Sequence, residues 1–266
     1  GSSIMKIQLI AITCGILAAL PVQAAEPLTD VQEIVKQANL VAYYQGDDGK
    51  ATVKMTITNK QGQERKREFN ILRKDVEDGA DQKYYVYFNK PSDVRKMVYL
   101  VHKHVTNDDD RWLYMPAIDR VNRIAAGDKR TSFAGSDFLY EDVSGRGLDE
   151  DLHELVQTTE TQYIVKNTPK EPDTVEFSYY NVAIDRKSFV PMKMEFFDKT
   201  NRLYRTIESK TVEVIDGFPT VTLSVVQDLK TGSQTEMKFD KVKYNIRLKD
   251  VFQERYLRRA PSEARR

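Results

Sequence analysis

Two histidines stand at the spacing of a strand, with an acidic run close behind them. His102 and His104 are separated by one residue, so both imidazoles lie on one face if this segment is extended. Residues 108–110, all aspartate, follow in a segment typical of a turn. Imidazole and carboxylate groups bind transition metals, so one hypothesis is a metal-dependent hydrolase. The alternative is a polar strand end running into an acidic hairpin turn, because His153 is the only other histidine and nothing pairs it with these two.

No other pattern in the chain matches a catalytic motif. The sequence lacks a Gly-x-Ser-x-Gly elbow, a phosphate-binding loop and a His-Glu-x-x-His zinc motif. The run Gly145-Arg146-Gly147 lacks the third glycine of a dinucleotide fingerprint. We therefore expect a protein that is not an enzyme, with no catalytic residue, no cofactor and no metal.

The N-terminal residues have the pattern of a secretory signal peptide. Residues 1–4 precede Met5, and the signal covers residues 5–24: Lys6, an apolar run over residues 7–20, and small residues before an expected cleavage at Ala25. Cys14 is the only cysteine, and acylation there is the lesser reading because residues 11–13 lack the leucine and the small residue of a lipoprotein signal. We expect a mature protein that works outside the cytoplasm of a bacterium.

Charge is balanced over the chain, with 41 Lys and Arg against 40 Asp and Glu. Lys6 accounts for the difference, so the mature protein has no global field that would attract nucleic acid. Basic residues gather at 65–67 and in the last residues of the chain. These clusters are interpreted as a solvated face and a frayed tail, or as contacts with an acidic partner or, transiently, with a membrane surface.

Hydrophobic periodicity predicts a mainly β fold in one domain, residues 25–266, with a short basic C-terminal tail. A first helix follows Thr29, which forms a capping box with Gln32. Two further short helices are predicted at residues 136–143, capped by Ser136 and ended by Gly145, and at residues 250–259. Period-two alternation predicts strands at residues 51–58, 64–73, 83–89, 97–105, 111–115, 162–168, 174–182, 192–197, 202–209, 220–229 and 234–246. About ten or eleven strands joined by short turns indicate an antiparallel sheet that curls into an unclosed half-barrel, lidded by the helices.

The side chains expected on the inner face of this sheet are large and adaptable. Methionine and aromatic side chains suit a cavity for variable apolar guests, although an ordinary packed core has the same composition. The candidates from the strands are Val53, Met55, Ile57, Phe69, Ile71, Tyr85, Phe177, Met192, Met194, Phe196, Met237 and Phe239.

One stretch resembles a known family. Arg111-Trp112-Leu113-Tyr114-Met115-Pro116, followed by Ser132-Phe133-Ala134-Gly135-Ser136-Asp137-Phe138-Leu139-Tyr140-Glu141-Asp142, is similar to the periplasmic outer-membrane lipoprotein-sorting proteins of the LolA-like class. The resemblance implies a LolA/LolB-like half-barrel with a hydrophobic cavity that carries acyl chains. It further implies a mature protein that is soluble in the periplasm of a Gram-negative bacterium. It also implies that Phe133, Phe138 and Tyr140 pack the lid or touch the guest, and that an inner-membrane transporter of the resistance-nodulation-division type is a partner.

Three functional hypotheses follow. The first is a monomeric periplasmic carrier for a lipid, a lipoprotein acyl chain or a similar hydrophobe. The second is a transporter subunit whose half-barrel is filled by its own side chains. The third is the metal-dependent hydrolase that uses His102 and His104.

Overall fold

The computed structural model describes residues 19, 26–77 and 79–266. The expected signal peptide thus lies outside the described residues, apart from Ala19. None of the helices in the described part of the chain is both long and apolar enough to cross a membrane.

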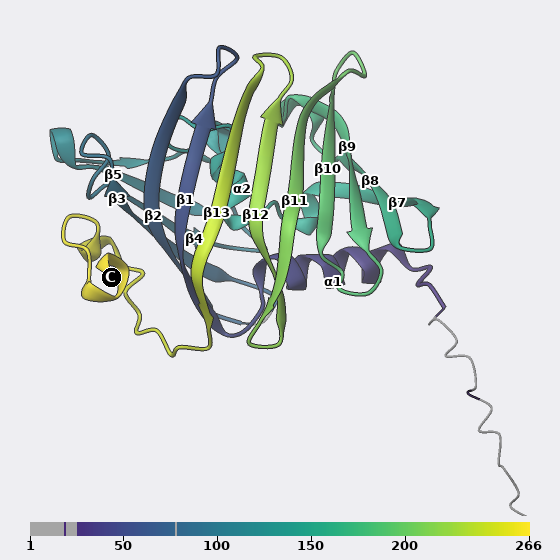
Figure 1. Ribbon diagram of the computed structural model, residues 1–266, viewed down its shortest axis with the longest axis horizontal. Coiled ribbons are helices and arrows are strands. Elements are labelled where there is room, and N and C mark those ends of the chain that lie inside the picture. The colour runs from purple at the N-terminus through teal and green to yellow at the C-terminus, as the bar shows by residue number, and fades with distance from the viewer. Residues whose placement is uncertain (1–18, 20–25, 78) are drawn as a thin grey trace, which may run out of the picture.

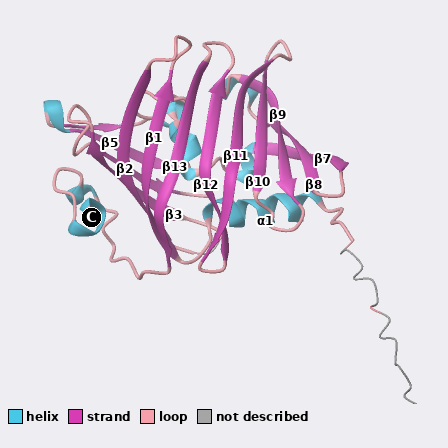
Figure 2. Ribbon diagram, viewed as in Figure 1, coloured by secondary structure: helices cyan, strands magenta, loops and turns pink. Residues whose placement is uncertain are grey.

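One antiparallel sheet of thirteen strands makes up most of the described chain (Figures 1 and 2). Its spatial order is β6-β5-β4-β3-β2-β1-β13-β12-β11-β10-β9-β8-β7, so the first and last strands pair in the middle and β6 and β7 form the two edges. The strands are β1 (Asp48–Thr58), β2 (Glu64–Asp75), β3 (Gln82–Lys90), β4 (Val98–Lys103), β5 (Asp110–Met115), β6 (Arg120–Arg123), β7 (Asp151–Thr158), β8 (Gln162–Pro169), β9 (Phe177–Asp185), β10 (Pro191–Asp198), β11 (Leu203–Ile215), β12 (Phe218–Asp228) and β13 (Ser233–Tyr244).

The predicted curled, unclosed sheet is confirmed, and two of its strands were not predicted. These are the edge strands β6 and β7, both in the stretch between residues 116 and 160. An edge strand can leave most of its side chains in water, so it needs little hydrophobic alternation to form. In β7, Leu152 and Val156 are exposed, which removes the apolar face that a pattern search relies on.

Helix α1 (Val31–Tyr43) lies across the concave side of the sheet, behind the strands in Figure 1. Its buried residues Ile34, Val35 and Ala38 pack with Tyr163 and Val165 of β8. The predicted cap is one residue off, because Asp30 and not Thr29 caps the helix: its carboxylate accepts a hydrogen bond from the Gln32 N–H at 2.9 Å.

A loop at residues 129–139 fills the concave side over β1 to β4. Phe133 is its anchor, with ring centroids 5.7 Å from Phe69 and Phe88 and 5.6 Å from Tyr99. Arg67 Nε donates to the Ala134 carbonyl at 2.9 Å and so ties the loop to β2. This loop closes that part of the half-barrel with the protein's own side chains.

The helix predicted at residues 136–143 is shorter and starts later. Helix α2 is Tyr140–Ser144, and Ser136 instead closes a turn by accepting a hydrogen bond from the Phe138 N–H at 3.1 Å. Asp142 accepts a hydrogen bond from the Leu139 N–H at 2.7 Å and thereby caps the helix start. Gly145 ends the helix as predicted, with φ at 87°.

The predictions for the C-terminal residues are wrong in two respects. Residues 250–259 hold only one turn of 3₁₀ helix, Glu254–Tyr256, and a short helix, α3 (Ser262–Arg265), follows. The tail is not frayed either: residues 247–266, the C-terminal strap, bury Leu248, Phe252 and Ala264 on the convex face. The strap is fixed because the outer faces of β2 to β5 are apolar at this place, through Leu72, Tyr85, Leu100 and Trp112 among others.

The strap predicts a measurable loss of stability. Phe252 has no exposed surface, so Phe252→Ala opens a cavity between strap and sheet and costs about 3–5 kcal/mol of unfolding free energy. Leu229→Ala is the control, because Leu229 is 49% exposed, and it should change stability by about 0.5 kcal/mol or less. Urea unfolding measures both, and equal effects of the two substitutions would contradict the docked strap.

Candidate functional site

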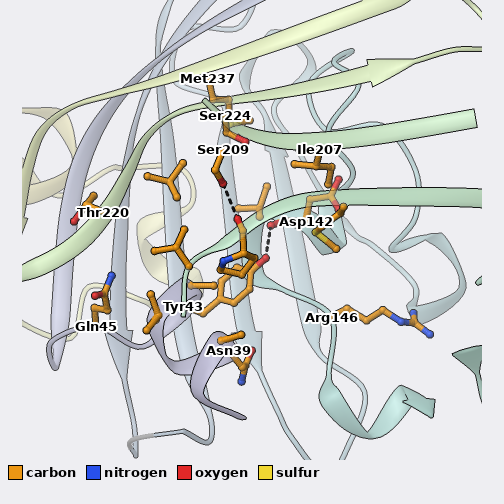
Figure 3. A pocket seen from close by; sticks show the side chains of 18 of the residues that line it. Asn39, Tyr43, Gln45, Asp142, Arg146, Ile207, Ser209, Thr220, Ser224 and Met237 are labelled. Atoms are coloured by element: carbon orange, nitrogen blue, oxygen red, sulfur yellow. Dashed lines mark hydrogen bonds between the residues drawn. The ribbon is translucent and has the colours of Figure 1, made fainter. Parts of the chain in front are cut away.

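A cavity of about 420 Å³ lies between α1 and the concave face of the sheet (Figure 3). α1 contributes Val35, Ala38, Asn39 and Tyr43, and the segment around α2 closes another side. The remaining walls come from the sheet: from β1 and β2, and then from β13, β12, β11, β10, β9 and β8 in spatial order. The volume falls within the range of roughly 300–1,000 Å³ that is usual for ligand pockets.

The wall that belongs to β10–β13 is apolar and only half-buried. Met194 and Ile207 stand directly opposite each other on β10 and β11. Val221 of β12 and the two β13 residues Phe239 and Val242 extend the same wall, and all five side chains are half-buried. The residues between them are short and polar, such as Ser209 and Ser224. Covering apolar surface of this kind with an apolar guest removes it from water, which is favourable.

The structure brings seven of the predicted lining residues together at the cavity. They are Phe69, Ile71, Phe138, Met194, Phe196, Met237 and Phe239. Contact of these side chains with a ligand stays a prediction.

Other predicted lining residues lie in closed parts of the core. Val53, Met55 and Ile57 are on the concave face, but the loop at residues 129–139 and Phe133 itself cover them. Tyr140 packs against the same cluster, and Phe177 belongs to the core below α1. Met192 is half-buried away from the cavity, beside a register shift between Pro191 and Lys193 that interrupts the alternation of β10.

The placement predicted for Tyr85 is wrong. Tyr85 lies on the convex face, where its hydroxyl donates a hydrogen bond to the Tyr256 carbonyl at 2.7 Å. Its neighbour Tyr84 lines the cavity instead. Strand β3 carries apolar side chains on both of its faces, because both faces are covered. Alternation along the sequence therefore does not show which face is the inner one.

Charged groups at the α2 end of the cavity were not predicted. Glu141 is at the centre, 2% exposed, with its carboxylate 2.8 Å from Arg130, 2.9 Å from Lys129 and 3.3 Å from Arg146. No periodicity marks these residues, because Lys129, Arg130 and Arg146 lie on irregular segments and Glu141 lies on the five-residue helix α2. The sequence holds two signals for this cluster: Glu141 lies in the family-like stretch at residues 132–142, and Arg146 lies in the Gly145-Arg146-Gly147 run.

Further acids complete the network around these cations. Arg130 pairs with Glu176 at 2.6 Å, and Arg146 Nε pairs with Asp151 at 2.9 Å. The Tyr180 hydroxyl also donates to Asp151, at 2.6 Å. The guanidinium carbons of Arg130 and Arg146 lie 4.8 and 5.3 Å from the Phe177 ring centroid, so the aromatic core provides part of their contacts.

Electrostatics within the network favour ionised Glu141. Burial alone would raise the pKa of its carboxyl, but Arg130, Lys129 and Arg146 outweigh burial and lower the pKa to about 2. The same acids raise the pKa of the Arg130 and Arg146 guanidinium groups above their ordinary value, against the effect of burial. The cluster is thus a set of charges that satisfy one another inside the protein.

Close contact between α1 and the α2 segment fixes the roof of the cavity. A Cβ atom on Gly145 would lie 2.8 Å from the Tyr43 ring, and its φ of 87° is also unfavourable for other residues. The Tyr43 hydroxyl donates to the Asp142 carbonyl at 3.4 Å, as Figure 3 shows. Glycine at this position therefore lets the two segments meet.

The histidines of the hydrolase hypothesis do not converge. His102 Nε2 lies 2.8 Å from the Phe252 carbonyl, and its ring packs on Trp112. His104 instead contacts Asp110 at 3.0 Å and Asp81 at 3.5 Å. Partial burial opposes protonation of His104, but the hydrogen bonds that its ring donates to these carboxylates raise its pKa above the ordinary value. Across residues 26–77 and 79–266, no three His, Cys, Asp or Glu side chains are grouped to hold a metal ion.

Comparison with known proteins agrees with the fold. A family model described as an uncharacterized protein matches residues 80–259. The chain is similar to a DUF1329 family protein from Desulfovibrio piger, with 28% identity, a TM-score of 0.77, and coverage of 86% of this chain and 100% of that one. An outer-membrane lipoprotein-sorting protein domain from Vibrio parahaemolyticus shares 26% identity at a TM-score of 0.76, with 85% and 97% covered.

A LolA superfamily protein from Nitrosomonas europaea has the same fold at 18% identity and a TM-score of 0.67, over 86% of this chain and 100% of that chain. The chain belongs to the LolA-like family. No curated protein matches the sequence. The LolA-like resemblance predicted from the motif at residues 111–142 is therefore confirmed.

Two methionines of this LolA-like protein should respond differently to the same substitution. Met55 is 1% exposed in the closed core, so Met55→Gln leaves an amide without partners and costs about 1–3 kcal/mol. Met194 is half-buried on the cavity wall, where water reaches the amide, so Met194→Gln should change stability by about 0.5 kcal/mol or less. Urea unfolding compares them. Similar losses for both would show that the cavity is as dry as the core.

Glu141 predicts the acid dependence of stability. Its folded pKa of about 2 lies below its unfolded value of roughly 4.3, so its contribution is complete above the unfolded pKa and is lost as the pH falls toward 2. Glu141→Gln removes the central carboxylate that Lys129, Arg130 and Arg146 share, although each cation keeps one other acid. We expect a cost of about 3 kcal/mol at pH 7 and a flatter stability profile between pH 5 and pH 2.

Thermal unfolding across this pH range tests the role of Glu141. The control is Glu160→Gln, which removes an exposed carboxylate and should leave the profile unchanged. A steep acid transition retained in the Glu141 variant would assign the pH dependence to other groups.

Proposed function

We propose that this LolA-like protein is a periplasmic carrier that binds a lipid, a lipoprotein acyl chain or a similar hydrophobe in the cavity beneath α1. The observation that carries the proposal is the half-buried apolar wall of Met194, Ile207, Val221, Phe239 and Val242, which faces a cavity of about 420 Å³. A protein that only needed a core would bury this wall, as it buries the neighbouring Val53 and Phe69.

The charges around the cavity indicate which part of the ligand enters it. Arg130, Arg146 and Glu141 pair with one another and with nearby acids. Arg73 donates to Asp75 at 2.6 Å, and Asp142 accepts from Arg205 and from the Leu139 N–H. None of these groups is left to neutralise a ligand charge. Lys50 and Lys243 also line the cavity, but Lys50 extends to the strap on the convex face and Lys243 stands opposite it on that face. Burying an unpaired charge is costly. The buried part of the ligand is therefore uncharged, and a charged headgroup stays in water.

The wider role is a shuttle between membranes. We include in the proposal a soluble, monomeric mature protein, brief contact with membrane surfaces, and an inner-membrane transporter of the resistance-nodulation-division type as partner. The support for these points is the signal-like N-terminus and the similarity to a lipoprotein-sorting protein domain.

The second candidate is a non-carrier subunit of a transporter. The observation that favours it is the loop at residues 129–139, which fills part of the half-barrel with Phe133 and Phe138. It differs from the carrier in one respect that is easy to measure: such a subunit does not take up an apolar probe.

Binding of the uncharged fluorophore N-phenyl-1-naphthylamine tests the carrier. Met194→Gln combined with Ile207→Asn places two amides on the wall and should weaken probe binding at least about tenfold, the effect of losing roughly 1.4 kcal/mol of apolar contact. The control is Leu152→Gln with Val156→Asn on β7, where both side chains are more than half exposed and away from the cavity. Hexadecanol should displace the probe at lower concentration than hexadecanoate.

Each result has a separate meaning. Absence of probe binding, or equal binding by the wall variant and the wild type, would overturn the carrier. Stronger displacement by hexadecanoate would leave the carrier standing and contradict the uncharged ligand. Urea unfolding of each variant confirms that the loss of binding is not a loss of folding.

A further inference from the structure

Six lysines gather on the convex side of the sheet, next to the C-terminal strap. This lysine face lies on β1, β13 and the end of β3, on the side opposite to α1 and α2 (Figure 1). It consists of Lys50, Lys54, Lys90, Lys238, Lys241 and Lys243. On β1, Lys50 pairs with Leu72 of β2, and Thr52 pairs with Asn70 of β2. Leu72 and Asn70 contact the strap, so the lysines on this face of β1 stand on the convex side.

Two pairs of these lysines stand directly opposite each other across β1 and β13. The partners are Lys50 with Lys243, and Lys54 with Lys238. Like charges in such cross-strand positions destabilise a sheet. The effect is visible at Lys50, whose pKa is lowered first by burial and then by the charge of Lys243.

Acidic residues on the same face offset only part of this charge. Asp240 lies 3.8 Å from Lys54, whose side chain is 61% exposed, and Glu68 stands opposite Lys54 on β2. Lys50 donates to the Glu263 backbone carbonyl at 2.6 Å, and the charge of Glu263 raises the pKa of Lys50, but burial and Lys243 outweigh it. Within residues 26–77 and 79–266, no ion pair reaches Lys90, Lys238, Lys241 or Lys243.

The surface is hollowed at the same place. A depression of about 590 Å³ is lined by Thr52, Lys54, Glu68, Lys90, Lys238, Asp240 and Lys241. Its floor is the centre of the sheet, where β1 pairs on both sides with long strands. A hollow lined by four lysines fits an anionic group that enters it.

We propose that the lysine face is a docking surface for an acidic segment of a partner protein, rich in Asp or Glu. Charge complementarity carries the assignment: the unpaired lysines cost stability in the free protein and gain counter-charges in the complex. The position favours a protein over a bilayer, because a membrane held on the convex face would leave the cavity, on the concave face, pointing away from it. A bound protein leaves the cavity accessible.

A fluorescein-labelled peptide of ten glutamates serves as the probe of this surface. Fluorescence anisotropy of the full chain should show binding that weakens as salt rises from 20 to 150 mM, because the contact is electrostatic. Lys54→Glu with Lys238→Glu should weaken peptide binding at least tenfold. The matched control is Lys170→Glu with Lys187→Glu, which makes the same change of charge at exposed lysines elsewhere, and it should stay within about twofold of wild type, since effects of remote exposed charges are screened.

A second measurement separates lost docking from lost folding. Lys238→Glu alone replaces a lysine pair by opposite charges, so its urea midpoint should equal or exceed that of wild type while peptide binding falls. The proposal is overturned if the peptide does not bind, or if the control reversal weakens binding as much as the lysine-face reversal. Binding to phosphatidylglycerol vesicles that is stronger than peptide binding and lost in the same double variant would also overturn it, in favour of a membrane.

Discussion

The structure depends on the fact that half of its sheet is apolar on both faces. Strands β2 to β5 place Phe69, Val86 and Tyr99 on the concave side and Leu72, Tyr85 and Leu100 on the convex side. Water must be excluded from both faces, so two separate segments are needed to cover them. The loop at residues 129–139 covers one and the C-terminal strap covers the other. The cover over strands β10 to β13 is helix α1, which leaves the apolar wall of these strands only half-buried, and the cavity lies between them.

Burial also determines how the charged side chains are arranged inside this protein. The segment that carries Arg130, Glu141 and Arg146 is too polar to pack as a normal core, yet it fills space next to Phe177 and Phe196. Mutual pairing makes its burial tolerable, since each ion has opposite charges within hydrogen-bond distance. The cavity is therefore apolar except at one end, where the charged groups are paired with one another. The lysines on the convex face, by contrast, lack a full set of counter-charges.

The sequence predicts a strand and its inner face correctly where the other face of the strand is exposed to water. Alternation located β1 and placed Val53, Met55 and Ile57 on the concave side, as observed. It failed for Tyr85, because β3 is buried on both sides, and for Met192, because a register shift interrupts β10. Alternation did not show that a loop covers Met55 while Met194 stays open to the cavity. That difference depends on contacts between segments about 80 residues apart along the chain, and no local pattern records the free-energy cost and gain of such contacts. The contacts within the charged cluster were not predicted for the same reason, although Glu141 and Arg146 lie in segments that the sequence marks.

The pairing of β1 with β13 has a consequence for the order of events in folding. Val53 meets Phe239 in the sheet, so the central ladder joins residues at nearly opposite ends of the described chain. Loop closure of this length must precede the contacts that reward it, which makes such a topology slow to form. As the polypeptide is synthesised, β1 to β6 emerge with one side of β1 unpaired, and the strap that covers their convex face comes last. The convex face of β2 to β5 thus remains uncovered until residues 247–266 have emerged.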